Sequence, residues 1–241
     1  MKILFLILYF NCIALAQSKL LLMFEESQVG AIPNYDTTTA IGTGTTSLDL
    51  IYPANITAGD ILIAQIEVDD AQNAPTITPP EGWVKGDSVI SGTYTRYKFA
   101  WYWKRADGTE TGNASFAGGG NEMMKGIMSK FSGCIATGNP YESIANSGVV
   151  ISGTLTSQEI TTLGANRLAV CLALVLDDNT LSANMTNYAT LFSGNSLVGS
   201  PDGQLIVFGL DVAVAGTIAA DSATNSASDA HAIFTFALIP E

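Results

Sequence analysis

Gly, Pro, Asn and Asp punctuate this chain so often that its apolar residues form runs too short for long helices. Most of these runs end at turn-forming residues within about ten positions, which is the usual upper length of a strand. No stretch keeps a helical period for more than about two turns. The pattern predicts an all-β protein, an antiparallel β-sandwich of jelly-roll type with about eight to ten strands and little helix.

The clearest expected strand lies between Thr93 and Arg105 and carries aromatic side chains at alternate positions. Successive side chains of a strand point to opposite faces, so these rings share one face and are expected to pack against a second sheet. Tyr102 falls on the other face. The rings of the first face are Tyr97, Phe99, Trp101 and Trp103.

Two further apolar runs resemble each other, and an acidic pair follows each of them. The run 61–68 ends in Asp69-Asp70, and the run 167–176 ends in Asp177-Asp178. We expect two equivalent strands whose ends meet at one edge of the sandwich. Four carboxylates at that edge would suit Ca²⁺, which prefers oxygen ligands, although acidic pairs are also common turn formers. No other cofactor is predicted.

The chain divides into three parts by composition. Residues 1–16 have one Lys, an apolar run and a closing Ala-Leu-Ala, which is the pattern of a signal peptide; an N-terminal apolar strand is the alternative. Residues 17–45 are expected to form an arm or linker, and residues 46–241 the sandwich domain. Within this domain a long polar connection is expected to begin at Asn139-Pro140-Tyr141. No segment is long enough to predict a transmembrane helix.

Charge and rare residue types exclude several functions. The chain has 10 Lys and Arg against 22 Asp and Glu, a net charge of -12, which disfavours binding to nucleic acid. His231 is the only histidine, so a Ser–His–Asp site is not expected. Glu67 and Asp69 begin a glycosidase-like carboxylate pattern, but Gln72 stands where its last carboxylate is required. The protein is therefore predicted not to be an enzyme, and Glu67 to lie at a solvated strand end.

Cys134 and Cys171 remain if the first sixteen residues are removed. They lie in or beside expected strands, and we predict two buried thiols, with a disulfide as the alternative. Several aromatic residues fall outside the expected core face and are predicted to contact a glycan or a neighbouring subunit: Trp83, Tyr94, Tyr102, Tyr141 and Tyr188.

Three segments together resemble a known kind of domain. They are Ala-Asn-Ile-Thr-Ala-Gly-Asp-Ile-Leu-Ile-Ala at 54–64, Ile-Thr-Pro-Pro-Glu-Gly-Trp at 77–83, and Trp-Tyr-Trp-Lys-Arg-Ala at 101–106. This order is similar to the jelly-roll domains of tailed-phage virion proteins, such as tail-associated, head-fibre and receptor-binding proteins. The resemblance covers about residues 45–240, and Asn-Arg-Leu-Ala-Val at 166–170 fits the same layout.

The resemblance implies a structural or adhesive role without catalytic residues. Its expected partners are further copies of the chain, as a homo-oligomer and most often a trimer, other virion or surface proteins, and a host-surface glycan. The expected location is a virion or the extracellular space. The alternative is a secreted, monomeric carbohydrate-binding module, which would have the same fold but would not assemble.

Overall fold

The computed structural model describes residues 30–69, 76–91, 97–118, 123–177, 179–196 and 203–241. These residues form seventeen strands and no helix, and every strand pairing among them is antiparallel. No helix in this part of the chain is long and apolar enough to cross a membrane. The all-β antiparallel sandwich predicted from the sequence is confirmed.

Each half of the chain builds one large sheet. In the first half the sheet order is β1-β9-β4-β7-β6, with β2 also on β9, and a small sheet has the order β3-β8-β5. The strands of this half are β1 (Asn34–Thr38), β2 (Gly42–Gly44), β3 (Ser47–Ile51), β4 (Ile61–Asp69), β5 (Ile77–Thr78), β6 (Val84–Ile90), β7 (Tyr97–Arg105), β8 (Asn113–Gly118) and β9 (Met123–Ser132).

The second half repeats this arrangement. Its large sheet has the order β10-β17-β12-β15-β14, with β13 also on β17, and β11 pairs with β16. The strands are β10 (Tyr141–Thr156), β11 (Ile160–Thr161), β12 (Arg167–Leu176), β13 (Leu181–Ala183), β14 (Ala189–Ser196), β15 (Gly203–Val212), β16 (Thr217–Ile218) and β17 (Ser222–Leu238).

The pairing in each half is nested. In the first half β4 pairs with β7, β3 with β8 and β1 with β9. In the second half β12 pairs with β15, β11 with β16 and β10 with β17. The predicted equivalence of the runs 61–68 and 167–176 is therefore confirmed, because β4 and β12 are the central strands of the two sheets. One jelly roll of eight to ten strands is not confirmed, since each large sheet comes from one half of the chain.

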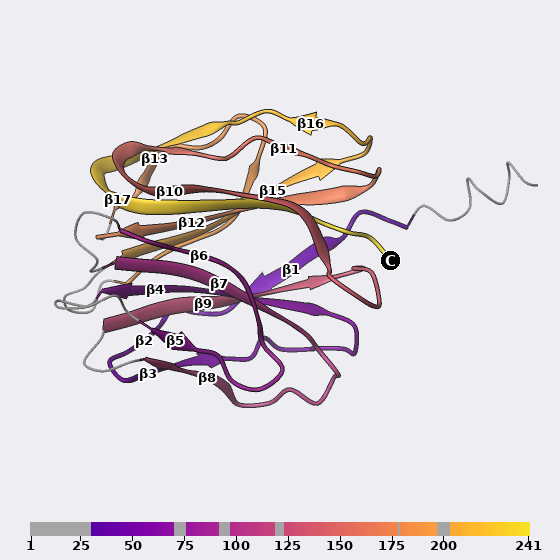
Figure 1. Cartoon of the computed structure of the whole chain (residues 1–241), viewed down its shortest axis with the longest axis horizontal. Helices are drawn as coiled ribbons and strands as arrows, with labels where there is room; N and C mark the ends of the chain where they lie inside the picture. The colour runs from indigo at the N-terminus through magenta and orange to yellow at the C-terminus, as the bar shows by residue number, and fades with distance from the viewer. Residues whose placement is uncertain (1–29, 70–75, 92–96, 119–122, 178, 197–202) are drawn as a thin grey trace, which may run out of the picture.

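The two large sheets pack face to face around a central core (Figure 1). The predicted aromatic face of β7 lies in this interface, where the Trp101 ring stacks on Phe236 of β17 with centroids 4.4 Å apart. Trp101 also limits its neighbour β6, because a Cβ at Gly86 would lie 2.4 Å from the indole ring. Apolar side chains of β4, β9, β12 and β15 complete the core.

Each large sheet is also apolar on its outer face, and a further layer covers it. The β3-β8-β5 sheet covers the first large sheet, and Leu48, Leu50 and Phe116 pack there against β4 and β7. The segments around β11 and β16 cover the second, with Leu155, Ile160 and Ile218 in contact with its outer face. The molecule thus has four β-layers, which Figure 1 shows stacked from β8 at the bottom to β16 at the top.

Two segments differ from the expectations drawn from the sequence. Residues 34–44 of the expected arm form β1 and β2, which pair with β9. The polar segment after Asn139, expected to be a connection, is the long strand β10. Both lie at a sheet edge, where one face and one side are open and the apolar alternation is therefore weak. Residues 1–29, including the predicted signal peptide, lie outside the described residues.

Candidate functional site

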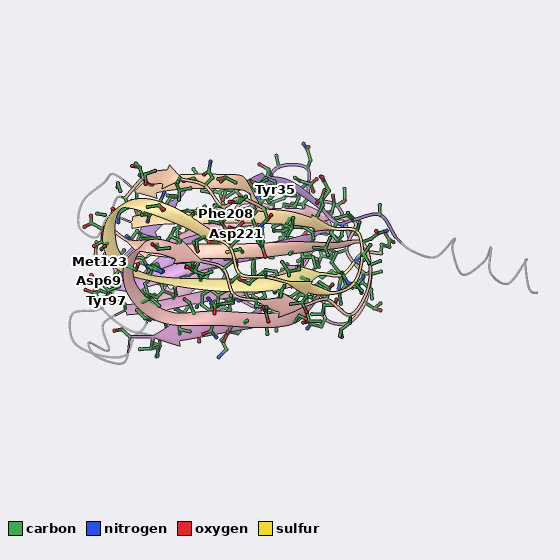
Figure 2. All side chains as sticks on the ribbon, turned by 90° about the horizontal axis from the view of Figure 1, so that it is seen from above. Tyr35, Asp69, Tyr97, Met123, Phe208 and Asp221 are labelled. Atoms are coloured by element: carbon green, nitrogen blue, oxygen red, sulfur yellow. The ribbon has the colours of Figure 1, made fainter. Side chains whose placement is uncertain are left out.

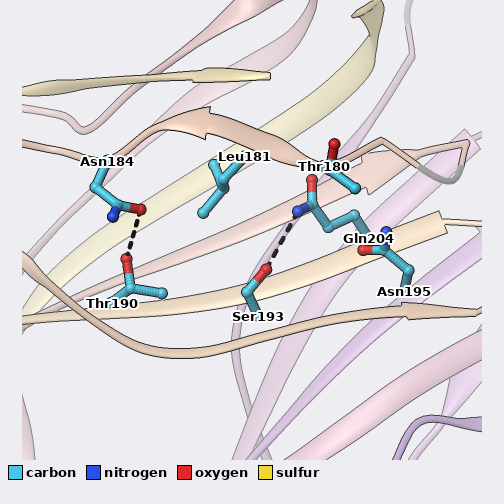
Figure 3. A pocket seen from close by; sticks show the side chains of 7 residues that line it. All are labelled: Thr180, Leu181, Asn184, Thr190, Ser193, Asn195 and Gln204. Atoms are coloured by element: carbon cyan, nitrogen blue, oxygen red, sulfur yellow. Dashed lines mark hydrogen bonds between the residues drawn. The ribbon is translucent and has the colours of Figure 1, made fainter. Parts of the chain in front are cut away.

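An open groove of about 420 Å³ lies on the outer face of the second large sheet, and its volume is in the range of small-molecule sites. Strands β14 and β15 form one side, and the segment around β13 forms the other (Figure 3). Its lining consists of Thr180, Leu181, Asn184, Thr190, Ser193, Asn195 and Gln204.

The described residues of the groove lining are mostly polar, and none of them is charged. Six of its seven residues bear an amide or a hydroxyl group, and Leu181 is the only apolar one. Thr190 Oγ1 donates to Asn184 Oδ1 at 3.1 Å across the groove (Figure 3). The lining thus offers neutral donors and acceptors and no titratable group, in a chain whose net charge is -12.

Gln204 is the most buried polar residue of the groove, with 1 % of its surface exposed. Its Nε2 donates to Ser193 Oγ at 3.2 Å. Among the described residues, no donor pairs with its Oε1. A buried polar atom without a partner costs about 1–3 kcal/mol. The amide lies between Ser193 and Thr180 in Figure 3, and Gln204 is one of the residues that line the groove.

A second buried amide without a hydrogen-bond partner among the described residues lies near the groove, on Asn225. Asn225 of β17 is directly opposite Leu181 in the β13–β17 pairing, and it is buried. Neither polar atom of its side chain has a hydrogen-bond partner among the residues that the structure describes. Directly opposite residues of an antiparallel pair share a face of the sheet, so Asn225 lies on the face of β13 that carries Leu181.

The groove lies where the second half departs from the first. In the first half β5 pairs with β8 and extends the covering sheet. In the second half β13 pairs with β17 and not with β16, the equivalent of β8. The groove therefore lies at the element by which the covering layers of the two halves differ.

A second hollow of about 360 Å³ lies beside the turn between β15 and β16. Its lining is mainly apolar, and Asp211, Asn187 and Thr217 supply its polar side chains. No unpaired buried polar atom lies in it among the described residues. The groove at Gln204 is accordingly the better candidate for a specific site.

Three of the five aromatic residues predicted to meet a ligand are core residues. Trp83 and Tyr188 directly precede β6 and β14, and each is buried in an outer core. Tyr102 is buried between β7 and the covering sheet, donates to Ile77 O at 3.3 Å, and has a pKa raised by burial to about 12. A ring must be open to solvent to stack on a sugar, and these three are not.

Of the other two aromatic residues, Tyr141 and Tyr94, the structure describes only Tyr141. Tyr141 is half-buried, and its ring packs edge-on against Trp101 and Phe236 at the border of the central core. Tyr94 lies outside the described residues. A binding role for either residue stays a prediction.

The predicted calcium site can be placed only in part. Asp69 ends β4, where it is paired in register with Tyr97 and Met123 (Figure 2). Asp177 follows β12 and is exposed. Asp70 and Asp178 lie outside the described residues. Within the described ranges, no three acidic, His or Cys side chains group as metal ligands. Calcium binding stays a prediction.

The prediction that Glu67 lies at a solvated strand end is wrong. Its carboxylate is fully buried and lies 3.1 Å from Lys125 Nζ of β9. The pair faces the second sheet, because a Cβ at Gly203 would lie 2.1 Å from Lys125 Nζ and 3.1 Å from Glu67 Oε2. The same Cβ would be 3.0 Å from Val175 O, so the ends of β4 and β12 meet here as expected. Alternation along β4 could not reveal this, since Glu67 and its partner come from different strands.

The single histidine and the two thiols are also buried. His231 is enclosed between β10 and β12 within the second sheet, and not at its edge. Burial lowers its pKa. Cys134 and Cys171 are free and buried, as predicted, and burial raises the pKa of each thiol to about 12.

The groove residues were not identified from the sequence. The signal in the chain was an uncharged stretch, since no Asp, Glu, Lys or Arg occurs between residues 179 and 196. That stretch also contains many Asn, Ser and Thr residues, which are equally typical of loops. The two ends of this stretch reach the same groove as Gln204 only through the pairing of β13 with β17, which is a tertiary contact.

A comparison of the chain with protein-family models found no match, and comparisons with curated proteins and with solved structures found none either.

Replacing Glu67 by Gln, or Lys125 by Met, is expected to lower the free energy of unfolding by about 3–5 kcal/mol, because each change leaves a buried charge without its partner. The double variant is expected to recover most of this loss. Denaturant unfolding of all four proteins measures the coupling. Additive losses in the double variant would show that the two groups do not interact.

His231 is expected to lower the free energy of unfolding as the pH drops below about 6.5, which is the ordinary pKa of a histidine side chain. The folded state resists protonation because burial lowers the pKa of His231, whereas the unfolded chain takes up the proton. The loss is absent above this pH, where both states are neutral. Melting temperatures between about pH 7.5 and pH 5.5 should decline for the native chain and stay flatter for His231→Gln. Equal slopes would contradict the assignment.

Proposed function

We propose that this protein is a non-enzymatic binding protein that holds a neutral, hydroxyl-rich ligand, of the kind a surface glycan presents, in the groove between β13 and β14. The observation that carries the proposal is the buried Oε1 of Gln204, for which the described residues supply no donor. A ligand hydroxyl would supply this donor once the Gln204 amide turns toward the groove. Binding would then remove a cost that the free protein bears.

The rest of the lining supports the same class of ligand. Carbohydrate hydroxyls both donate and accept, and the groove offers amides and hydroxyls that do the same. No charged side chain occurs among the described lining residues, so these residues offer no counter-ion to a phosphate, a carboxylate or a metal ion. Leu181 supplies an apolar contact for the carbon face of a sugar ring. We therefore favour a neutral glycan over an anionic one.

In its wider role the protein is proposed to be a structural or adhesive subunit of a virion or surface fibre, which assembles with its own copies and with other surface proteins. The segments at 54–64, 77–83 and 101–106 support this through their resemblance to tailed-phage domains. The alternative is a secreted monomeric carbohydrate-binding module, which the polar lining of the groove suits equally well.

Replacing Gln204 by Met nearly keeps the side-chain volume and removes both the oxygen and the nitrogen of the amide. We expect the native chain to bind neutral oligosaccharides on a glycan array, and Gln204→Met to weaken that binding at least about tenfold. The melting temperature should change little, because the lost hydrogen bond from Nε2 to Ser193 is offset by removal of the buried Oε1, which has no partner among the described residues. Titration calorimetry with the best array hit gives the affinities.

Gln158→Met is the matched control, because Gln158 lies between β10 and β11 and does not line the groove. It should bind like the native chain. Binding should also be constant from about pH 5.5 to pH 8, since no lining residue titrates there. Native binding that survives Gln204→Met, or an array on which only acidic glycans bind, would contradict the proposal.

A further inference from the structure

The second large sheet has a long open edge at β10. This strand of 16 residues pairs with β17 on one side, and no other described strand pairs with it. An open edge presents unpaired backbone N–H and C=O groups, which can pair with another chain. Natural proteins usually protect such edges with charges, bulges or prolines.

Charge does not protect this edge. No residue from Ser143 to Thr156 is charged, and none is proline. Both edge strands of the other large sheet differ, because β6 carries Lys85 and Asp87 and β1 carries Asp36. β10 is therefore a neutral edge on a chain of net charge -12.

Bulges protect only the first part of β10. Between Glu142 and Val149 its pairing with β17 shifts twice, and each shift inserts one extra residue in β10. Beyond Gly148, β10 runs on without an extra residue, because the later shift between Ser152 and Thr154 takes its additional residues from β17. The part from Val149 to Thr156 is thus the regular, pairable part of the edge.

This regular part exposes apolar side chains. Ile151 is 68 % exposed and Val150 is 38 % exposed. Both have β-branched side chains, which favour strands. An uncharged, β-branched edge segment without proline has the features of a strand that pairs with another strand.

We propose that two copies of this chain pair edge to edge through β10, antiparallel and about a two-fold axis close to Ile151. A second copy is the occupant that the charge pattern permits at this edge, because β10 itself carries no charge from Ser143 to Thr156, so the paired strands of two chains of net charge -12 would bring no like charges of their own together. A two-fold axis brings the same strand of each copy together in opposite directions, which is the antiparallel pairing of the rest of the sheet. The pairing would join the two second sheets into one and bury Val150 and Ile151 of both copies.

The groove stays open in this dimer. β10 and β14 are the opposite edges of the sheet, in the order β10-β17-β12-β15-β14, and the groove is at β14. Two grooves on one particle would strengthen binding to a surface that repeats the same ligand. Only this last consequence rests on the proposed function, since the pairing itself does not involve the groove.

Light scattering on a size-exclusion column tests the pairing with the full chain. The native protein should have the mass of two chains, and the double change Val150→Lys, Ile151→Lys should give one chain, because it places like charges at the axis. Val214→Lys is the matched control: Val214 is at least as exposed as Ile151 but lies in the turn between β15 and β16, so this variant should remain a dimer. Circular dichroism confirms that each variant is folded.

A cysteine scan tests the geometry without weakening the edge. Single cysteines at positions 149–153, in a Cys12→Ser chain, should yield a disulfide-linked dimer for at least one position near the axis on oxidation. Cys134 and Cys171 are buried and should not interfere. Val214→Cys should stay uncrosslinked. A native protein that is a monomer or a trimer, a lysine variant that remains dimeric, or a scan without crosslinks would overturn the proposal. Loss of glycan binding by a variant that stays dimeric would concern the groove alone.

Discussion

The burial of two apolar sheet faces against each other is the interaction on which the rest of this structure depends. Trp101 from the first half stacks on Phe236 from the second, and apolar side chains of β4 and β12 fill the space around them. These central strands are apolar on both faces, so each large sheet must also be covered on its outside. The β3-β8-β5 sheet and the layer around β11 and β16 meet that need, which explains why the molecule has four layers.

The repetition of one topology in the two halves makes their differences informative. Trp83 and Tyr188 occupy equivalent positions before β6 and β14, and each closes an outer core. The halves differ at β5 and β13, which pair with different neighbours. The groove lies beside β13, and its described lining is mostly polar. In the first half, the β3-β8-β5 sheet packs apolar side chains on the outer face of the large sheet. A site placed on a repeated scaffold can thus arise without disturbing the central core.

Much of the fold could be predicted from the sequence, because the pattern of a strand is local. Alternation identified the inner face of β7, and the matching runs identified β4 and β12 as equivalent strands. β10 was missed because an edge strand with one neighbour needs little apolar alternation. Tyr102 was assigned to an open face because alternation distinguishes two faces of a strand and does not show that a third sheet covers one of them. Glu67 was misplaced because its partner Lys125 comes from another strand, which alternation along β4 does not show.

By itself, the sequence determined the all-β class, the antiparallel sandwich and the aromatic side chains by which β7 faces the central core. These follow from the period of the apolar residues and from the turn-forming residues between them, and both are properties of neighbouring positions. Only the tertiary structure decided which strands pair, how four layers stack and where a groove stays open. Those features depend on contacts between residues far apart in the chain, such as Leu181 with Asn225 or Glu67 with Lys125, and local patterns do not encode them.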